Sequence, residues 1–342
     1  MMIKLLNNPT FDNERNILNA DLFVNNLKNT LKAFNLYTKV TYKVYRNITI
    51  YNITWNDDKT YEQILEYRKE IAVSLGIRSE ELNVKKISDN ELEITTLNMK
   101  REPLTLKEVL SDYKKDSAFK VALGIDEKDN IIYFDFDKEK SLLVTGVTGT
   151  GKTNLFNNII MNILINNDNA KIIILDSQGI NYNQYNNVCE VVNNEEKIIE
   201  RIKLLRDEFE DRIKDGSKDR TIVFIDEIYE ILNIDPSIKD DINYLLEIGS
   251  IANIHLIVST DSVTEDNTYD LFKKDNISKL TFYLTSRSEY NLFMNEVVTE
   301  SLNKDGIFLG QNKKLIRISI PLIKDDEIER VVKYEENKRE KN

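Results

Sequence analysis

The amino-acid sequence predicts an α/β fold with a central, mostly parallel sheet, preceded by a small α+β domain. From residue 142 onward, short and continuously apolar segments alternate with segments of helical periodicity, as in parallel sheets that are buried on both faces. A glycine-rich turn follows the first of these apolar segments and holds three of the chain's ten glycines. The residues before about 103 instead combine strands of alternating polarity with two amphipathic helices.

The first part of the chain is expected to form a separate domain over residues 1–103. Apolar residues recur there at helical or strand spacing. The expected elements are a helix at 15–35, strands within 38–55, a helix at 61–77 that ends at Gly76, and two short strands within 84–98. Pro103 and the polar residues around it mark the boundary to a second domain, 104–342.

The second domain begins with a short helix and a hairpin before the regular alternation starts. Its elements are expected, in order, as a helix at 104–113, hairpin strands at 120–126 and 130–136, a strand at 142–145, a helix at 152–165, a strand at 171–176, a helix at 195–214, a strand at 221–226, a helix at 240–252, strands at 254–259 and 279–284, final strands between 306 and 323, and a charged helix from about 325. This order predicts the parallel sheet.

Composition excludes several classes of protein. The formal net charge is −11, which argues against a broad nucleic-acid-binding surface. A lone cysteine, Cys189, provides neither a disulfide framework nor a cysteine-based metal site. No apolar run reaches the ~18 residues that a membrane span needs, and the first residues do not resemble a signal peptide. We therefore expect a cytoplasmic protein whose membrane association, if any, depends on a partner protein.

The glycine-rich turn matches the pattern G-x-x-x-x-G-K-[ST], between an apolar strand and an amphipathic helix. Glycines let backbone N–H groups point at an anion, and the helix N-terminus adds its dipole. Lys152 is expected to reach the β- and γ-phosphates of ATP, and Thr153 to place its hydroxyl on Mg²⁺. The predicted nucleotide-binding residues are Gly146, Val147, Thr148, Gly149, Thr150, Gly151, Lys152, Thr153 and Asn154.

Besides the Thr153 hydroxyl, a carboxylate is needed to hold the water shell of the metal. Asp226 ends the apolar segment 221–226, and ligands bind at the carboxyl ends of parallel strands. We expect Asp226 to orient Mg²⁺ and Glu227 to polarise the attacking water, so that Glu227 and Lys152 are the catalytic residues. Asp176 also ends a strand, but no acid follows it, and it ranks second.

The order of these segments resembles the FtsK/SpoIIIE DNA translocases, RecA-like motors that act as hexameric rings on double-stranded DNA. The resemblance covers the run into the P-loop, the helix LLRDEFEDRI, the segment IVFIDEIYEIL around the strand 221–226, and the segment ANIHLIVST around the strand 254–259. It implies a structural role for the only histidine, His255, in that last strand. The small first domain is similar to the one that precedes the motor in that family. The resemblance implies a homo-oligomeric ring and duplex DNA as the partner, held mainly through its phosphates.

Three departures from the family pattern bear on function. The membrane-spanning and winged-helix parts do not occur in this sequence, so septum anchoring and sequence-directed loading are not expected. Asp261 stands where the family usually has Gln, and an unpaired carboxylate there would repel the γ-phosphate. Ser250 stands where the family has an arginine that reaches the neighbouring subunit's nucleotide; Arg287 is a candidate substitute.

The leading hypothesis is an ATP-dependent translocase of double-stranded DNA, working in the transfer or partition of a mobile element. A second hypothesis is a nucleotide-binding assembly or regulatory protein that has weak or no ATPase activity of its own. A third is a protein-secretion ATPase of the FtsK type, although such motors usually carry several ATPase modules and membrane segments.

Overall fold

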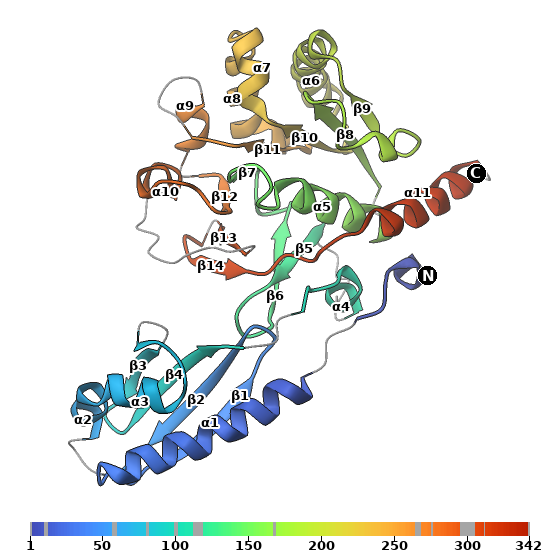
Figure 1. Cartoon of the computed structure of the whole chain (residues 1–342). Helices are drawn as coiled ribbons and strands as arrows, with labels where there is room; N and C mark the ends of the chain where they lie inside the picture. Colours follow the sequence, from blue (N-terminus) through green and yellow to red (C-terminus); the bar gives the residue numbers. More distant parts are fainter. Residues whose placement is uncertain are drawn as a thin grey trace. The chain divides into compact units, whose positions relative to one another are not determined.

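The computed structural model describes residues 2–9, 13–56, 60–79, 82–98, 102–111, 119–166, 169–263, 268–274, 276–294, 305–310 and 312–340. The chain forms two compact units, each of which is drawn in Figure 1. The small unit comprises Thr10–Pro103 and Glu127–Asn130, and the large unit comprises Met1–Pro9, Leu104–Asp126 and Ile131–Asn342.

The small unit is an antiparallel sheet with three helices. Its strands follow the order β1-β2-β4-β3. The elements are α1 (Glu14–Ala33), β1 (Lys39–Val44), β2 (Ile48–Thr54), α2 (Thr60–Glu66), α3 (Arg68–Ser74), β3 (Asn83–Ser88) and β4 (Glu91–Leu97). Leu27 and Leu31 of α1 share one apolar core with Ile53 of β2 and Leu92 of β4. All four of these side chains are fully buried, so the periodic apolar residues hold this unit together.

The predicted helix at 61–77 is in fact two helices. The helical path is interrupted at Tyr67, between α2 and α3, where the φ and ψ angles are −88° and 16°. The Tyr67 ring stacks on Phe34 with 3.9 Å between the ring centroids. Gly76 lies beyond the end of α3 with a φ of 68°, a conformation that glycine adopts without strain.

The large unit is built on an eight-stranded sheet in the order β14-β13-β12-β7-β11-β10-β8-β9. The strands are β7 (Leu142–Thr145), β8 (Ala170–Asp176), β9 (Glu190–Val192), β10 (Arg220–Asp226), β11 (Ile254–Thr260), β12 (Ser278–Thr281), β13 (Gly306–Leu309) and β14 (Leu315–Ile318). Pairing is parallel from β12 to β9, and antiparallel at β12–β13 and β13–β14. The predicted fold class, a mostly parallel sheet after a small α+β unit, is therefore confirmed.

Helices cover both faces of this sheet (Figure 1). They are α5 (Lys152–Asn166), α6 (Glu195–Asp215), α7 (Ile228–Ile234), α8 (Ile238–Ile248), α9 (Tyr269–Phe272), α10 (Arg287–Met294) and α11 (Asp325–Arg339). Alternate residues of each central strand point to opposite cores: Ile222 and Phe224 of β10 pack with α5 and α11, whereas Val223 and Ile225 pack with α6, α7 and α8. Burial on both faces explains why these strands are continuously apolar in the sequence.

A two-stranded hairpin and two short helices precede the eight-stranded sheet in the described chain of the large unit. They are η1 (Met2–Leu5), α4 (Leu106–Ser111), β5 (Lys120–Ile125) and β6 (Ile131–Asp135). Asn158 and Asn162 of α5 are fully buried and hydrogen-bond to the Ala122 backbone of β5. These bonds satisfy buried polar groups at the place where the hairpin meets the helix.

Several details of the large unit differ from the sequence prediction, and one of them is β9, which no predicted element covers. Helix α7 was not expected; Ile228, Ile231 and Leu232 bury one of its faces directly after β10. The predicted helix at 240–252 is α8 followed by the 3₁₀ turn η4 (Gly249–Ala252). A strand was expected at 279–284, but β12 ends at Thr281, after which the chain turns beneath the glycine-rich loop.

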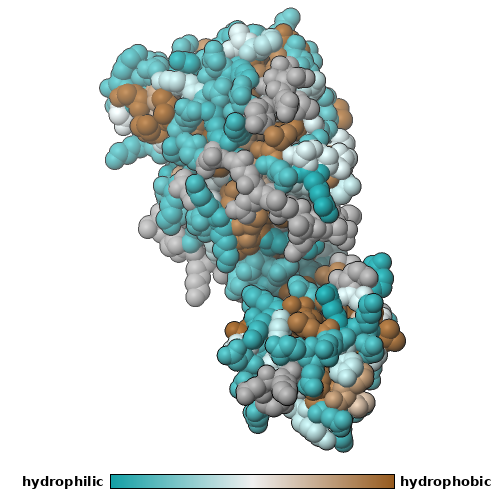
Figure 2. Space-filling view, turned by 90° about the vertical axis from the view of Figure 1, so that its left-hand side faces the viewer, coloured by the Kyte–Doolittle hydropathy of each residue, from teal (hydrophilic) through white to brown (hydrophobic). Residues whose placement is uncertain are grey.

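Figure 2 shows a mainly hydrophilic surface with separate apolar areas. Exposed large apolar side chains occur in both units, for example Leu18 and Leu22 on α1, and Ile180 and Ile251 in the large unit. Such single residues are common on soluble proteins and do not define a docking face. Within the described residues, no helix is both long and apolar enough to cross a membrane.

Candidate active site

The glycine-rich loop runs from the carboxyl end of β7 to the first turn of α5. Gly146, Gly149 and Gly151 have φ angles of 154°, 81° and 127°, which residues with a side chain rarely adopt. Space is also limiting, because a Cβ on Gly146 would lie 2.6 Å from the Cβ of Phe282. Phe282 itself is tied to the loop's base by a 2.8 Å hydrogen bond from its N–H to the carbonyl of Thr145. The glycines therefore let the loop turn tightly over the chain that follows β12.

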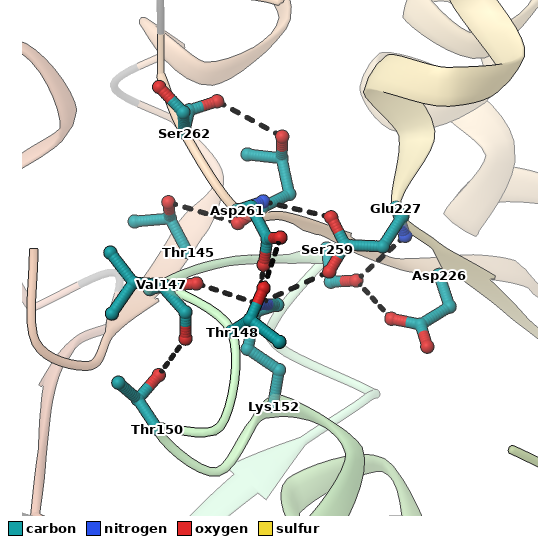
Figure 3. A network of polar contacts seen from close by, with 12 residues as sticks. Thr145, Val147, Thr148, Thr150, Lys152, Asp226, Glu227, Ser259, Asp261 and Ser262 are labelled. Carbon is teal, nitrogen blue, oxygen red and sulfur yellow. Dashed lines mark hydrogen bonds and ion pairs between the residues drawn. The ribbon is translucent and has the colours of Figure 1, made fainter. Parts of the chain in front are cut away.

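Lys152 is the first residue of α5, and its ammonium is almost completely buried. Nζ lies 2.6 Å from the carbonyl oxygen of Gly146 and 3.1 Å from Oε1 of Glu227. Its shortest contact is with Oδ1 of Asp261 (Figure 3). Three oxygen acceptors thus surround the cation, in the place where the sequence predicts phosphate oxygens.

Asp226 ends β10 and accepts two hydrogen bonds from hydroxyl groups. The Ser259 hydroxyl donates to Oδ1 at 2.5 Å, and the Tyr182 hydroxyl donates to Oδ2 at 3.1 Å. Burial raises the pKa of Asp226 above its usual value, although these two hydrogen bonds act in the opposite direction. The carboxylate is therefore fixed through both of its oxygens.

Asp176, the second candidate for this role, lies beside Asp226 on the neighbouring strand β8. Its Oδ2 accepts a hydrogen bond from the N–H of Asn181 at 3.0 Å, whereas its buried Oδ1 has no hydrogen-bond partner among the described residues. The geometry favours Asp226 for the metal, because hydrogen bonds from Ser259 and Tyr182 fix both oxygens of the Asp226 carboxylate.

Glu227 lies immediately after β10 in a left-handed conformation, with φ and ψ of 51° and 59°. Its N–H donates to the Ser259 hydroxyl at 3.1 Å, and its Oε2 accepts a hydrogen bond from the N–H of Asp261 at 2.9 Å. Burial is the main cause that raises the pKa of Glu227 to about 7, while Lys152 acts against the shift and Asp261 adds to it. The strained backbone at this position turns the side chain towards Lys152.

Asp261, which the sequence marks as a departure from the family, is paired in the structure. Besides Lys152, it accepts a 2.7 Å hydrogen bond at Oδ2 from the Thr148 hydroxyl (Figure 3). Burial acts to raise the pKa of Asp261, but the hydrogen bonds from Lys152 and Thr148 outweigh it and lower the pKa. The carboxylate thus holds the loop and its lysine together.

The remaining sequence-predicted residues lie at different places. The Asn154 side chain faces away from the loop: its Nδ2 donates to the carbonyl of Pro321 at 2.8 Å, and its Oδ1 accepts from the N–H of Ile323 at 2.9 Å. Arg287 is exposed at the start of α10, after the carboxyl end of β12. Ser250 precedes the amino end of β11, at the opposite edge of the sheet. Arg287 therefore does not occupy the place of Ser250.

His255 is buried at the amino-terminal edge of the sheet, away from the loop. Its Nδ1 lies 2.8 Å from the Lys140 carbonyl oxygen, and its ring meets Phe136 edge-on. Burial lowers the pKa of His255 to about 4, so the ring is neutral at pH 7. Across the described ranges, no group of three or more His, Cys, Asp or Glu residues could by itself hold a metal ion.

Two residues of the site were missed in the sequence, Tyr182 and Ser259. Ser259 interrupts the apolar run of β11 next to its carboxyl end, where a polar residue indicates a functional edge. Tyr182 lies in irregular chain between β8 and the 3₁₀ helix η3 (Asn183–Tyr185), where no periodicity marks it.

This arrangement, with a glycine-rich loop after β7, a lysine at the start of α5 and a carboxylate pair at the carboxyl end of β10, which β11 separates from β7, defines a P-loop ATPase fold. Residues 106–269 match the FtsK/SpoIIIE family model. This part of the chain is an FtsK/SpoIIIE-family domain, and the resemblance noted in the sequence is confirmed.

Two curated relatives illustrate the match. The DNA translocase FtsK of Caldanaerobacter subterraneus subsp. tengcongensis is 25% identical in an alignment 343 residues long. The alignment covers 90% of this chain and 48% of the relative. The protein of the same name from Bacillus cereus is 25% identical in an alignment 378 residues long, which covers 97% of this chain and 47% of the relative. The chain thus spans about half the length of the curated relatives it matches.

Solved structures share the fold. The pCW3 conjugation coupling protein TcpA, in its monomer form with ATPγS, has a TM-score of 0.60 at 15% identity and covers 92% of this chain and 99% of its own. The cytoplasmic domain of the type VII secretion ATPase EccC of Thermomonospora curvata has a TM-score of 0.55 at 14% identity, covering 68% of this chain and 34% of its own.

Proposed function

We propose that this chain binds ATP with Mg²⁺, hydrolyses it, and uses the reaction to move double-stranded DNA. The observation that carries the proposal is the meeting of Lys152, Asp226 and Glu227 at the carboxyl edge of the parallel sheet, beside the glycine-rich loop. The FtsK/SpoIIIE-family domain and the relatives named DNA translocases support duplex DNA as the substrate. A homo-oligomeric ring and a role in mobile-element transfer or partition belong to the same proposal.

The residues present fit Mg²⁺, which prefers hard oxygen ligands and keeps several waters. Thr153 and Asp226 would hold the ion, one through its hydroxyl and the other through the water shell. The hydroxyl of Tyr182 donates to Asp226 and lies near the Thr153 side chain. When bound, Mg²⁺ neutralises charge on the β- and γ-phosphate oxygens.

The chain's own groups would perform the remaining tasks. Lys152 exchanges Asp261 for phosphate oxygens, which keeps the buried ammonium paired throughout. Glu227 orients a water towards the γ-phosphorus and accepts its proton as the bond from phosphorus to the bridging β–γ oxygen breaks. The left-handed backbone at Glu227 and the hydrogen bond from the N–H of Asp261 keep the Glu227 side chain pointing towards the glycine-rich loop.

A second candidate function is nucleotide binding without turnover. It is favoured by the resemblance to the family, which implies an arginine at the place of Ser250. Losing such an arginine costs on the order of 10³-fold or more in hydrolysis. This candidate assigns the chain to assembly or regulation beside an active motor.

Steady-state ATP hydrolysis with and without long linear duplex DNA separates the two candidates. The proposal predicts hydrolysis that duplex DNA stimulates, and a stimulation that weakens steeply with salt because phosphate contacts dominate. Lys152→Ala should abolish both binding and hydrolysis, whereas Glu227→Gln should abolish hydrolysis alone. Tight binding of ATP without hydrolysis in the presence of duplex DNA would favour the second candidate.

A further inference from the structure

Tyr182 is a buried tyrosine whose hydroxyl lies at the candidate active site, and the P-loop pattern assigns it no role. It lies six residues after Asp176, the last residue of β8, in chain that leads to η3. The side chain is fully buried, and its ring is tilted against that of Phe156 on α5, with 6.2 Å between centroids. Packing therefore fixes the ring in place before any ligand binds.

The hydroxyl of Tyr182 connects the two residues that are expected to hold the metal. It donates a hydrogen bond to Oδ2 of Asp226 at 3.1 Å, and the Thr153 side chain lies close enough to its oxygen to act on its pKa. A phenol has one proton and two lone pairs, so once that proton is given to Asp226 the oxygen serves as an acceptor.

The state of the phenol is also set by its surroundings. Burial, followed by the nearby charge of Asp226, raises the pKa of Tyr182 well above its ordinary value. The group therefore stays a neutral donor to the carboxylate throughout the physiological pH range. The hydroxyls of Tyr182 and Ser259, one on each carboxylate oxygen, together fix the orientation of the Asp226 side chain.

We propose that Tyr182 is a positioning residue for Mg²⁺, which fixes the Asp226 carboxylate and offers its oxygen to the ion's water shell when Thr153 turns to the metal. The proposal rests on the function proposed above. Outer-shell hydrogen bonds of this kind typically change metal affinity 10–100-fold when they are removed. The phosphate cradle itself does not include Tyr182, so binding of a nucleotide without metal should not depend on its hydroxyl.

Tyr185 provides a matched control three residues away. It too is fully buried, and its hydroxyl donates one hydrogen bond, to Oδ1 of Asn157 at 3.1 Å. Replacing either tyrosine by phenylalanine removes one buried hydroxyl and one hydrogen bond, at comparable expected cost to stability. Only Tyr182→Phe removes a group that touches Asp226.

The experiment measures the dissociation constant of ATPγS for the full chain with saturating Mg²⁺ and with EDTA. The unaltered chain and Tyr185→Phe should bind more tightly with Mg²⁺; Tyr182→Phe should lose about tenfold of that enhancement and keep the EDTA value. An unchanged or larger enhancement in Tyr182→Phe would overturn the proposal. If even the unaltered chain showed no enhancement by Mg²⁺, the proposed function itself would fail.

A second measurement does not require a variant that lacks the hydroxyl. With 3-fluorotyrosine placed at position 182, the fluorine resonance should shift when Mg²⁺ is added to the ATPγS-bound chain. The same label at position 185 should shift little. Equal responses at the two positions would contradict a specific role of Tyr182 towards the metal.

Discussion

Asp261 contacts through Oδ1 the ammonium of Lys152, so a carboxylate of the chain itself pairs with the lysine that we propose as a phosphate ligand. The two residues lie 109 positions apart and meet because β11 pairs with β7 in the sheet. The hydrogen bond from Thr148 to the same carboxylate extends the contact to the loop. The proposed function therefore requires ATP to displace Asp261 before its phosphates reach Lys152.

Replacing Asp261 by asparagine should tighten ATP binding. The substitution removes the competing negative charge and the repulsion towards phosphate. Because the Asp261 side chain is 42% exposed, solvent screens the effect, and we expect about fivefold, or ~1 kcal/mol. Titration calorimetry measures it. Asp270→Asn is the control, since it removes an equal charge that pairs with Lys239 elsewhere; equal affinities in the two variants would contradict displacement.

Gly146→Ala should destabilise the large unit more than Gly149→Ala does. Both positions have positive φ angles, but only a Cβ at 146 would collide, at 2.6 Å from Phe282 and 2.8 Å from Thr150. We expect an additional loss of about 2 kcal/mol in the free energy of unfolding, typical of overpacking. Urea unfolding without nucleotide tests this prediction. Similar losses of unfolding free energy in both variants would show that backbone strain alone, and not the collision, determines the loss.

Asn154→Ala should reduce stability while leaving ATP affinity nearly unchanged. The variant leaves the Pro321 carbonyl and the Ile323 N–H without their side-chain partner. A loss of about 1–2 kcal/mol in unfolding free energy follows from these bonds. A large fall in ATP affinity with unaltered stability would instead place the Asn154 side chain on the nucleotide.

The chain should lose stability between pH 6.5 and 4 partly through His255. Its pKa is about 4 in the folded chain and ordinarily 6.5, so the unfolded chain binds the proton first as the pH falls. The stability that the neutral ring contributes is fully present above pH 6.5, and its loss reaches an upper limit of about 3 kcal/mol below pH 4. Unfolding curves of His255→Gln should show a weaker loss over this window; an unchanged pH dependence would assign the loss to other groups.

The sequence alone indicated those parts of the candidate site that are close together in the chain. The glycine-rich loop, Lys152 and Thr153 are defined by one motif, and Asp226 with Glu227 by the end of one apolar strand. Alternation of strands and helices also predicted the parallel sheet, because burial on both faces leaves a continuous apolar signal.

The contacts of Asp261, Ser259 and Tyr182 could not be predicted in the same way. Their partners depend on the strand order β7-β11-β10-β8, which brings residues distant in sequence to one edge. The sequence suggested repulsion at Asp261, since it showed an acid in place of a neutral donor but not the ammonium beside it. Helix α7 was missed for a different, local reason, because it is short and follows β10 directly.

Displacement of a third strand from linear duplex DNA tests the central claim most directly. A triplex-forming oligonucleotide is bound at one end of the duplex, and its release is followed with and without ATP. The account predicts release that requires ATP and Mg²⁺ and is lost in Glu227→Gln, which should still bind ATP. Release that is independent of ATP, or no release by a chain that hydrolyses ATP in the presence of duplex DNA, would contradict it.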